Sequence, residues 1–256
     1  MTHRTLLAEM TREQIRQIAP TTTVVLPTAA VEQHGPHLPI ATDTLACTTI
    51  CQRAAELASA EGTPVTVAPP VHFGASHHHR PYPGVLSLSL TTFVQVVKEI
   101  CESLALSGFR RIAIVNGHGG NDAAIRVAAT DVSLAHPVSV AAASYWTIAA
   151  GGLIEDGRVR EVGQLPGHAG GFETSLVLAL GADLVDRASY PPALGAGRPY
   201  PADMAQRATV IREGGSIGAG PGYTDDPSGA SAEHGQHLLG IITRELARFL
   251  VEFSRQ

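Results

Sequence analysis

The sequence predicts an α/β fold of three layers, α/β/α, in which helices cover both faces of a mostly parallel central sheet. Short runs rich in β-branched residues alternate with longer helical patterns along the first half of the chain. The runs at 22–26 and 111–115 are typical of buried strands. Glycines and prolines mark the ends of most segments. Because strands alternate with helices, the pattern favours a parallel sheet.

Each element follows from its own local pattern. Residues 5–18 predict one amphipathic helix, and Pro20 ends it. Pro27 is expected to stop the first strand. The other expected elements are a helix at 43–60, a strand at 64–68, a long loop at 69–90, a helix at 91–107, the strand at 111–115, a glycine-rich loop at 116–121, a helix at 121–135, a strand at 138–143 and an apolar helical run at 176–180. Residues 190–230, rich in proline and glycine, are expected to form an ordered excursion or lid, with disorder as the alternative.

The composition limits the classes of function. Residues 1–256 show no break typical of a linker, so we expect a single domain. The net charge of −5 argues against a nucleic-acid surface. The three cysteines form no Cys-x-x-Cys pair, which favours reduced thiols. The chain shows neither a signal-peptide pattern nor an apolar stretch long enough for a bilayer. We therefore expect a cytoplasmic protein without a nucleic-acid or membrane partner.

Metal-ligand side chains gather in one short stretch. Glu32, His34, His37 and Asp43 lie within twelve residues, in a segment that prolines stiffen. Carboxylates and imidazoles suit Zn²⁺, Mn²⁺ or Fe²⁺. In an extended loop Glu32 and His34 point to the same side. The alternative is that Asp43 only caps a helix and that His34 is an ordinary loop residue. For the group as a whole, metal ligation is favoured.

Two later segments carry further candidates. His118 lies at the centre of a glycine-rich turn, 116–121, that leaves a strand and opens a helix. A phosphate-binding loop is the alternative, but neither glycine fingerprint of such loops is present. A histidine there favours metal ligation or acid–base work instead. His168 and Glu173 precede an apolar helical run, where His168 could simply cap the helix and Glu173 could complement its dipole.

Together these segments resemble the creatininase family. The matching residues are Leu26-Pro27, Glu32-Gln33-His34-Gly35-Pro36-His37-Leu38-Pro39, Thr42-Asp43-Thr44, Asn116-Gly117-His118-Gly119-Gly120-Asn121, His168-Ala169-Gly170, Phe172-Glu173-Thr174-Ser175 and Ala230-Ser231-Ala232-Glu233-His234-Gly235. Their order and spacing cover most of residues 20–185. The resemblance implies a creatininase-like α/β/α fold and a homo-oligomer, since family members assemble as hexamers.

The resemblance also implies a site for two divalent metal ions, zinc in the first place and manganese or iron as alternatives. The implied ligands are Glu32, His34, Asp43, His118 and Glu173. Glu32 and His118 would hold one ion and His34 the other, with Asp43 as the bridge. Creatininase itself carries an acidic ligand where this chain has Gly120. Glu173 is expected to replace that ligand.

The implied chemistry is attack of a metal-activated water on a carbonyl carbon. A general acid–base residue must then move a proton to the leaving nitrogen. His168 is expected in that role by its match to the catalytic histidine of the family. His37 is the second candidate, or it hydrogen-bonds a metal ligand.

The expected contacts to the substrate come from two other segments. The histidine-rich loop that contains His78 and Arg80 is expected to face the site, with Arg80 binding a carboxylate. A solvated loop is the alternative interpretation. Tyr145 and Trp146 are expected to line the pocket, although buried aromatic residues also serve as core.

The leading functional hypothesis is hydrolysis of a C–N bond in a small cyclic amide, such as a creatinine-like lactam or a hydantoin-type ring. Creatinine itself is not favoured, because creatininases enclose it with more than one tryptophan and this chain has only Trp146. Peptidases of the mycofactocin-precursor type, formamide deformylases and enzymes for an inositol-derived ketone share the scaffold, so the scaffold does not choose among them. A metal-binding protein without catalysis is the alternative from another class.

Overall fold

The centre of the structure is a parallel sheet, seen in a computed structural model that describes residues 4–192 and 221–256. Its strands are β1 (Thr23–Thr28), β2 (Val65–Val67), β3 (Arg111–Asn116) and β4 (Ser139–Ser144). They lie in the order β2-β1-β3-β4, and each neighbouring pair is parallel. The predicted parallel sheet is therefore confirmed.

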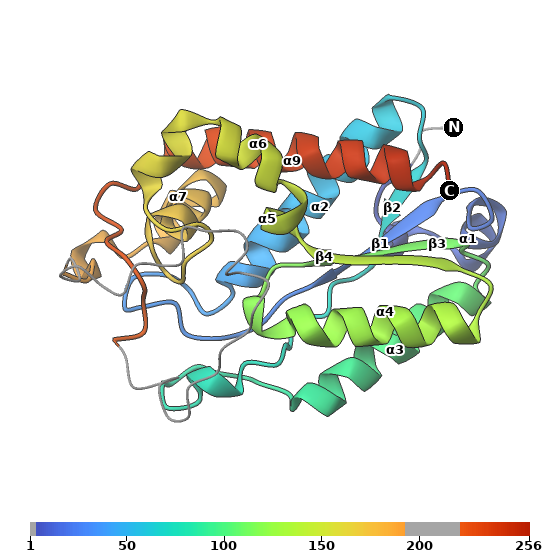
Figure 1. Ribbon diagram of the computed structural model, residues 1–256, viewed down its shortest axis with the longest axis horizontal. Helices are drawn as coiled ribbons and strands as arrows, with labels where there is room; N and C mark the ends of the chain where they lie inside the picture. Colours follow the sequence, from blue (N-terminus) through green and yellow to red (C-terminus); the bar gives the residue numbers. More distant parts are fainter. Residues whose placement is uncertain (1–3, 193–220) are drawn as a thin grey trace.

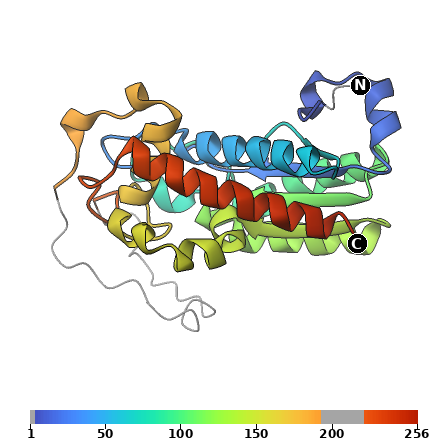
Figure 2. The same cartoon turned by 90° about the horizontal axis from the view of Figure 1, so that it is seen from above.

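Helices cover both faces of this sheet (Figure 1). Helices α2 (Thr42–Ala60) and α9 (Ala232–Phe253) lie on one face, and α3 (Leu90–Leu106) and α4 (Asp122–Ala135) lie on the other. Seen from above in Figure 2, α2 and α9 run side by side. The other α-helices are α1 (Arg12–Ile18), α5 (Tyr145–Ile148), α6 (Ala150–Glu155) and α7 (Gly171–Leu180). Short 3-10 turns span Leu7–Glu9, His77–His79, Gly119–Asn121, Gly157–Val162, Ala182–Leu184 and Arg187–Ser189.

The two central strands, β1 and β3, contribute side chains to two separate cores. Val25 and Val115 pack in the core on the side of α2 and α9. Leu26 and Ile114 pack in the core on the side of α3 and α4. Successive side chains of a strand point to opposite faces, and here both faces are buried. A central strand of this sheet must therefore be apolar at nearly every position, as the sequence pattern indicates.

The prediction of one helix over 5–18 was wrong. The segment forms a 3-10 turn at Leu7–Glu9 and then a separate helix, α1. Thr11 separates the two, because its side-chain oxygen accepts a hydrogen bond from the Gln14 backbone N–H. The Gln14 side chain accepts in return from the Thr11 backbone N–H, at 2.8 Å. This reciprocal capping box begins a new helix at Arg12 instead of continuing the turn.

The expectation that Pro27 stops the first strand was also wrong. β1 continues to Thr28, and Pro27 is in register with Val115 of β3. A proline removes one backbone donor, but its carbonyl remains an acceptor. The Pro27 carbonyl accepts a hydrogen bond from the Val71 N–H at 2.9 Å. The lost donor therefore does not end the strand.

Two further expectations concern the chain outside the sheet. Most of the predicted excursion at 190–230 lies outside the described residues, since 193–220 are not described. Within 4–192 and 221–256, the helices are too short or too polar to cross a bilayer.

The loops that follow β1, β2 and β3 are tied together at one end of the sheet. Asn121 is completely buried and makes the connection. Its side-chain amide donates to the Ala29 carbonyl at 3.0 Å, and its carbonyl oxygen accepts from the Ala75 N–H at 2.9 Å. In parallel sheets the carboxyl ends of the strands are where ligands bind. The candidate metal ligands lie at this end.

Helix α9 approaches α7 closely through Gly235. A Cβ atom at Gly235 would run into the backbone carbonyl of Ser175, which cannot move without shifting α7. We expect Gly235→Ala to destabilise the fold by about 1–3 kcal/mol, as overpacking does elsewhere. Gly240 lies in the same helix, and a Cβ atom there would meet only the end of the flexible Arg244 side chain. Gly240→Ala should be neutral or stabilising by up to about 1 kcal/mol. Urea unfolding of both variants measures the difference, and equal stabilities would contradict this packing.

Candidate metal centre

His34 is held by its own loop. It is buried, and its Nδ1–H donates to the backbone carbonyl of Glu32 at 3.2 Å. This bond directs Nε2 toward two carboxylates. Nε2 lies 3.1 Å from Asp43 Oδ1 and 3.7 Å from Glu173 Oε2. A backbone partner on one ring nitrogen and carboxylates at the other is the arrangement of a metal-ligating histidine.

His118 has a matching arrangement on the other side of Asp43. Its Nε2–H donates to the backbone carbonyl of Ala75 at 3.4 Å. Its Nδ1 lies 3.2 Å from Asp43 Oδ2 and 3.3 Å from Glu32 Oε1. The two imidazoles therefore approach the two oxygens of one carboxylate. Each imidazole also has a second carboxylate within reach.

Asp43 does not cap its helix. Helix α2 begins at Thr42 and its N-cap is Ala41, which makes no side-chain capping bond. The interpretation of Asp43 as an N-cap was therefore wrong. As the second residue of the first turn, Asp43 points inward and is 4% exposed. Its Oδ2 accepts no hydrogen bond although it is buried, which leaves a carboxylate oxygen available for a cation.

Glu173 enters the site from the first turn of α7. Its Oε2 accepts a hydrogen bond from the Ala169 N–H at 2.6 Å. Ala169 has a φ of 50°, an uncommon left-handed conformation for a residue with a side chain. That conformation occurs where the chain turns this N–H toward the carboxylate.

Position 120 of the glycine-rich loop has no space for an acidic side chain. A Cβ atom there would clash with Nε2 of His118 and would lie 2.6 Å from the Ala75 carbonyl oxygen. In this geometry position 120 has no room for a carboxylate side chain. The third carboxylate near the two histidines comes from Glu173 instead.

The electrostatics follow from this packing. Burial raises the pKa of Glu173 despite the opposing effect of His34. Burial lowers the pKa of a histidine, but in His118 the charge of Glu32 and the adjacent Asp43 carboxylate outweigh it and raise the pKa to about 10. In His34, burial is outweighed mainly by the charge of Asp43, which raises the pKa well above its usual value. Burial raises a carboxyl pKa, yet the pKa of Asp43 is lowered because His34 and His118 outweigh burial.

The donor set fits divalent cations. Three buried carboxylates and two buried imidazoles converge on a small volume, and burying such charges without compensation is unfavourable. Ligand atoms of Glu32, His34 and Asp43 lie within 4.8 Å of one another, as do those of His34, His168 and Glu173. Oxygen and imidazole donors of this kind suit zinc or manganese.

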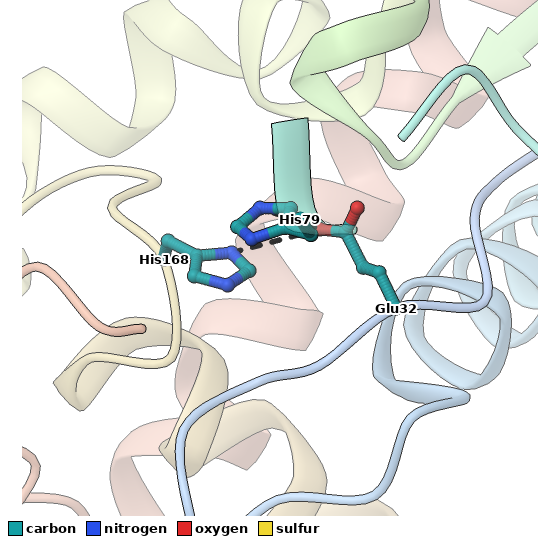
Figure 3. A group of neighbouring side chains, drawn as sticks. All are labelled: Glu32, His79 and His168. Atoms are coloured by element: carbon teal, nitrogen blue, oxygen red, sulfur yellow. Dashed lines mark ion pairs between the residues drawn. The ribbon is translucent and has the colours of Figure 1, made fainter. Parts of the chain in front are cut away.

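A second group of side chains lies beside Glu32. His79 and His168 come from separate loops and approach its carboxylate from the same side (Figure 3). His79 Nε2 lies 3.4 Å and His168 Nδ1 lies 3.7 Å from Glu32 Oε1. The two rings are stacked, with centroids 4.4 Å apart. The structure thus brings the predicted His168 to the edge of the candidate metal centre.

Gln33 orients both of these rings. Its Oε1 accepts from the Gly35 N–H at 2.9 Å, which fixes the direction of the amide. Its Nε2 then donates to His79 Nδ1 at 2.9 Å and to His168 Nε2 at 3.0 Å. Because these nitrogens act as acceptors, each neutral ring carries its proton on the nitrogen that faces Glu32. Burial lowers the pKa of His79 to about 3 and holds that of His168 well below its usual value, with His34 adding to the shift in His168.

His37 lies apart from the candidate metal ligands. Its Nε2 is 2.8 Å from the Thr174 hydroxyl, and its ring contacts Tyr190 edge to face. Burial and the neighbouring His34 lower its pKa to about 4. His37 is absent from the groups of ligand atoms found among the described residues.

The four residues expected to contact the substrate occupy different environments. His78 stacks on the ring of His118 with centroids 5.5 Å apart. Arg80 is exposed at the end of the His77–His79 turn. Tyr145 is buried and lines a small internal space together with Asp43 and Glu173. Trp146 packs against the core on the side of α9.

Sequence reasoning missed three residues of this site. His79 was named only as part of a histidine-rich loop, and Gln33 only as part of a motif. Ser76, completely buried, donates its hydroxyl to Glu32 Oε2 and was not singled out. A histidine run alone does not say which ring turns inward, because a 3-10 turn points successive side chains in different directions.

A groove opens beside the candidate metal centre. Its volume is about 630 Å³. The lining residues of the described chain are Gln33, His34, Gly35, Pro36, Leu38, Ile40, Tyr82, Pro83, Ser189, Tyr190, Pro191, Pro192, Pro221 and Tyr223. Gln33 and His34 belong both to the groove and to the site. The groove is therefore continuous with the candidate metal centre.

Curated relatives are similar over most of this chain. A mycofactocin precursor peptide peptidase of Mycolicibacterium smegmatis is 31% identical over 250 residues, covering 94% of this chain and 88% of the relative. A creatinine amidohydrolase of Pseudomonas putida is 31% identical over 244 residues, covering 88% of this chain and 86% of the relative.

Solved structures share the fold. A candidate creatinine amidohydrolase of Bacteroides fragilis superposes with a TM-score of 0.77 at 27% identity, covering 100% of this chain and 98% of that protein. A mutant creatininase of Zn–Zn type gives 0.77 at 28% identity, covering 97% of both chains. A manganese form of creatininase gives 0.76 at 28% identity, covering 97% of this chain and 98% of the other. The family model for creatininase, described as creatinine amidohydrolase, matches residues 8–250, and this chain therefore belongs to the creatininase family of amidohydrolases.

Proposed function

We propose that the chain hydrolyses the C–N bond of an amide with two divalent metal ions. The observation that carries this proposal is the position of Asp43, whose two oxygens each face a different imidazole nitrogen. One carboxylate between two sets of donors is the geometry of a bridging ligand in a two-metal hydrolase. Membership of an amidohydrolase family supports the same chemistry.

The residues divide into two ligand sets. Glu32, His118 and Asp43 Oδ2 would hold one ion. His34, Glu173 and Asp43 Oδ1 would hold the other. We propose zinc as the first choice, with manganese or iron as alternatives; zinc and manganese forms of creatininase support the first two. When bound, such ions lower the pKa of a water molecule and polarise the scissile carbonyl.

His168 is the proposed proton donor to the leaving nitrogen. Its pKa, lowered by burial and by His34, keeps the ring neutral at pH 7. Gln33 donates to its Nε2, so the neutral ring carries its proton on Nδ1, on the side of Glu32. To protonate the leaving nitrogen, the ring would first take up a proton from the attacking water and then pass one on, so that it ends neutral again. A positioned histidine of this kind contributes about 10²–10⁴-fold to the rate. His37 is the alternative acid–base residue, although its contact with Thr174 points it elsewhere.

The substrate proposed from the sequence is a small cyclic amide, a lactam or a hydantoin-type ring. Because relatives are named as a peptidase and as a creatinine amidohydrolase, a peptide bond and creatinine are further candidate substrates. A formamide is another candidate. Substrate contacts by His78, Arg80, Tyr145 and Trp146 belong to this proposal. So do a homohexamer and a cytoplasmic location.

Assays of zinc-loaded and manganese-loaded protein on lactams, hydantoins, formamides and short peptides test the proposed activity. Two bound ions with no turnover of any of these would favour a metal-binding protein without catalysis.

The bridge predicts the loss of both ions from one substitution. Asp43→Ala removes an oxygen from each ligand set, so we expect bound metal to fall from two ions per chain to fewer than one and turnover to disappear. Elemental analysis after gel filtration measures this. Glu233→Ala, at an exposed position in the first turn of α9, is the control and should keep both ions. An Asp43→Ala protein that retains two ions contradicts the bridging role.

Metal binding should release protons. Without metal, His34 and His118 have raised pKa values, about 10 for His118, so both rings carry an extra proton at pH 7. A ligating nitrogen must lose that proton, and we expect release of about two protons per chain and weaker binding as the pH falls. Calorimetric titration of zinc in PIPES and in HEPES, which bind zinc weakly and differ in ionisation enthalpy, measures the number. Identical heats in the two buffers would contradict the protonated cluster.

Gln33 is expected to act as a positioning residue for His168. Gln33→Met keeps the size of the side chain but removes the amide, so His168 loses the donor that selects its tautomer. We expect kcat to fall by about 10–100-fold with metal content unchanged, as for other residues that orient a catalytic group. Gln95→Met on the exposed face of α3 is the control. If His168→Gln and Gln33→Met lower kcat additively in the double variant, the two residues act independently and this role fails.

A further inference from the structure

The groove beside the metal centre differs in chemistry from the centre itself. Its described walls consist mainly of proline, tyrosine and aliphatic side chains, and they contain no Asp, Glu, Lys or Arg. Arg80, the residue expected to bind a carboxylate, is not among the lining residues. Against these described walls, a charged group would lose hydration without meeting a side chain of opposite charge, which is unfavourable.

We propose that the substrate carries, next to its scissile amide, an extended uncharged apolar segment that lies in this groove. The inference rests on the proposed function and adds the chemical class of the substrate. It holds whether the amide itself is part of a ring or of an open chain.

Continuity with the reacting centre supports the proposal. His34, a proposed metal ligand, and Gln33, which orients His168, both line the groove. A substrate whose carbonyl lies at the metal ions therefore has its adjoining atoms at the mouth of the groove. The groove requires no second binding event, because it extends the same site.

The size of the groove supports an extended segment. Its 630 Å³ falls within the roughly 300–1,000 Å³ typical of pockets for drug-sized ligands. A single five-membered ring would leave most of that space to water. The remaining space suits a chain of several carbon atoms or a short peptide.

The wall chemistry supports an apolar segment. Tyr82, Tyr190 and Tyr223 supply aromatic rings from three separate segments, and Ile40 on the wall is 42% exposed. Tyr223 donates its hydroxyl to the Pro192 carbonyl at 3.0 Å, which joins two of these segments into one wall. Grooves lined by aromatic side chains are also how other proteins bind extended peptides.

Hydroxamates test the proposal, because the hydroxamate group binds metal ions and the rest of the molecule extends into the groove. The probes are acetohydroxamate, hexanohydroxamate, 6-aminohexanohydroxamate and adipic monohydroxamate, titrated calorimetrically into zinc-loaded protein. We expect hexanohydroxamate to bind at least about tenfold more tightly than acetohydroxamate, since each fully buried methylene adds about fourfold. The two charged analogues should lose most of this gain.

Variants locate the effect. Tyr82→Ala and Tyr223→Ala should weaken hexanohydroxamate binding by about threefold or more and leave acetohydroxamate binding and zinc content unchanged. Leu134→Ala, at an exposed apolar position on α4 far from the groove, is the control and should change neither. Unchanged zinc and acetohydroxamate binding also shows that the variants are folded.

The outcomes separate this inference from the proposed function. If acetohydroxamate binds but hexanohydroxamate binds no more tightly, the groove does not hold the substrate, as when a second copy of the chain covers it. Charged analogues that bind as tightly as hexanohydroxamate likewise overturn the inference while the metal centre stands. A zinc-loaded protein that binds none of the four probes contradicts the proposed function itself.

Discussion

The carboxylate of Asp43, placed between His34 and His118, is the interaction on which the rest of the site depends. Its two oxygens lie 3.1 and 3.2 Å from nitrogens of two rings that come from loops after different strands. All three groups are buried, so none can be left without a partner of opposite charge or a cation. Helix α2 and the two loops must therefore keep their relative positions, and the parallel sheet provides that because β1 and β3 end side by side.

Backbone groups hold this arrangement before any ligand arrives. The carbonyls of Glu32 and Ala75 each accept a hydrogen bond from one imidazole, which turns the other nitrogen of that ring toward the carboxylates. Asn121 joins the loops that carry these carbonyls. The donors are thus fixed by contacts within the fold, and a preorganised set of donors binds metal with little rearrangement. Relatives named as a peptidase and as a creatinine amidohydrolase match the chain over this scaffold, so the scaffold by itself does not specify the substrate.

Much of the fold could be predicted because it depends on local patterns. Strands with apolar side chains on both faces require a sheet that helices cover on both sides. This part of the prediction was confirmed. The errors arose where two local structures were possible and the sequence pattern did not show which one forms. Thr11 formed a capping box that broke the expected first helix, and Pro27 kept its acceptor and stayed within β1. Asp43 had a side chain suited to an N-cap, but the helix began one residue earlier.

By itself the sequence determined the class of fold, the family and the kinds of donor atoms, since strand patterns and the spacing within Glu32–Asp43 are properties of the chain. The tertiary structure alone decided which atoms meet. It placed Glu173 beside His34 and left no room for a side chain at Gly120, because contacts between residues far apart in the chain depend on how helices and loops pack. It also turned His78 and His79, out of three consecutive histidines, toward the site, because the direction of a side chain in a short turn follows from the packing around that turn.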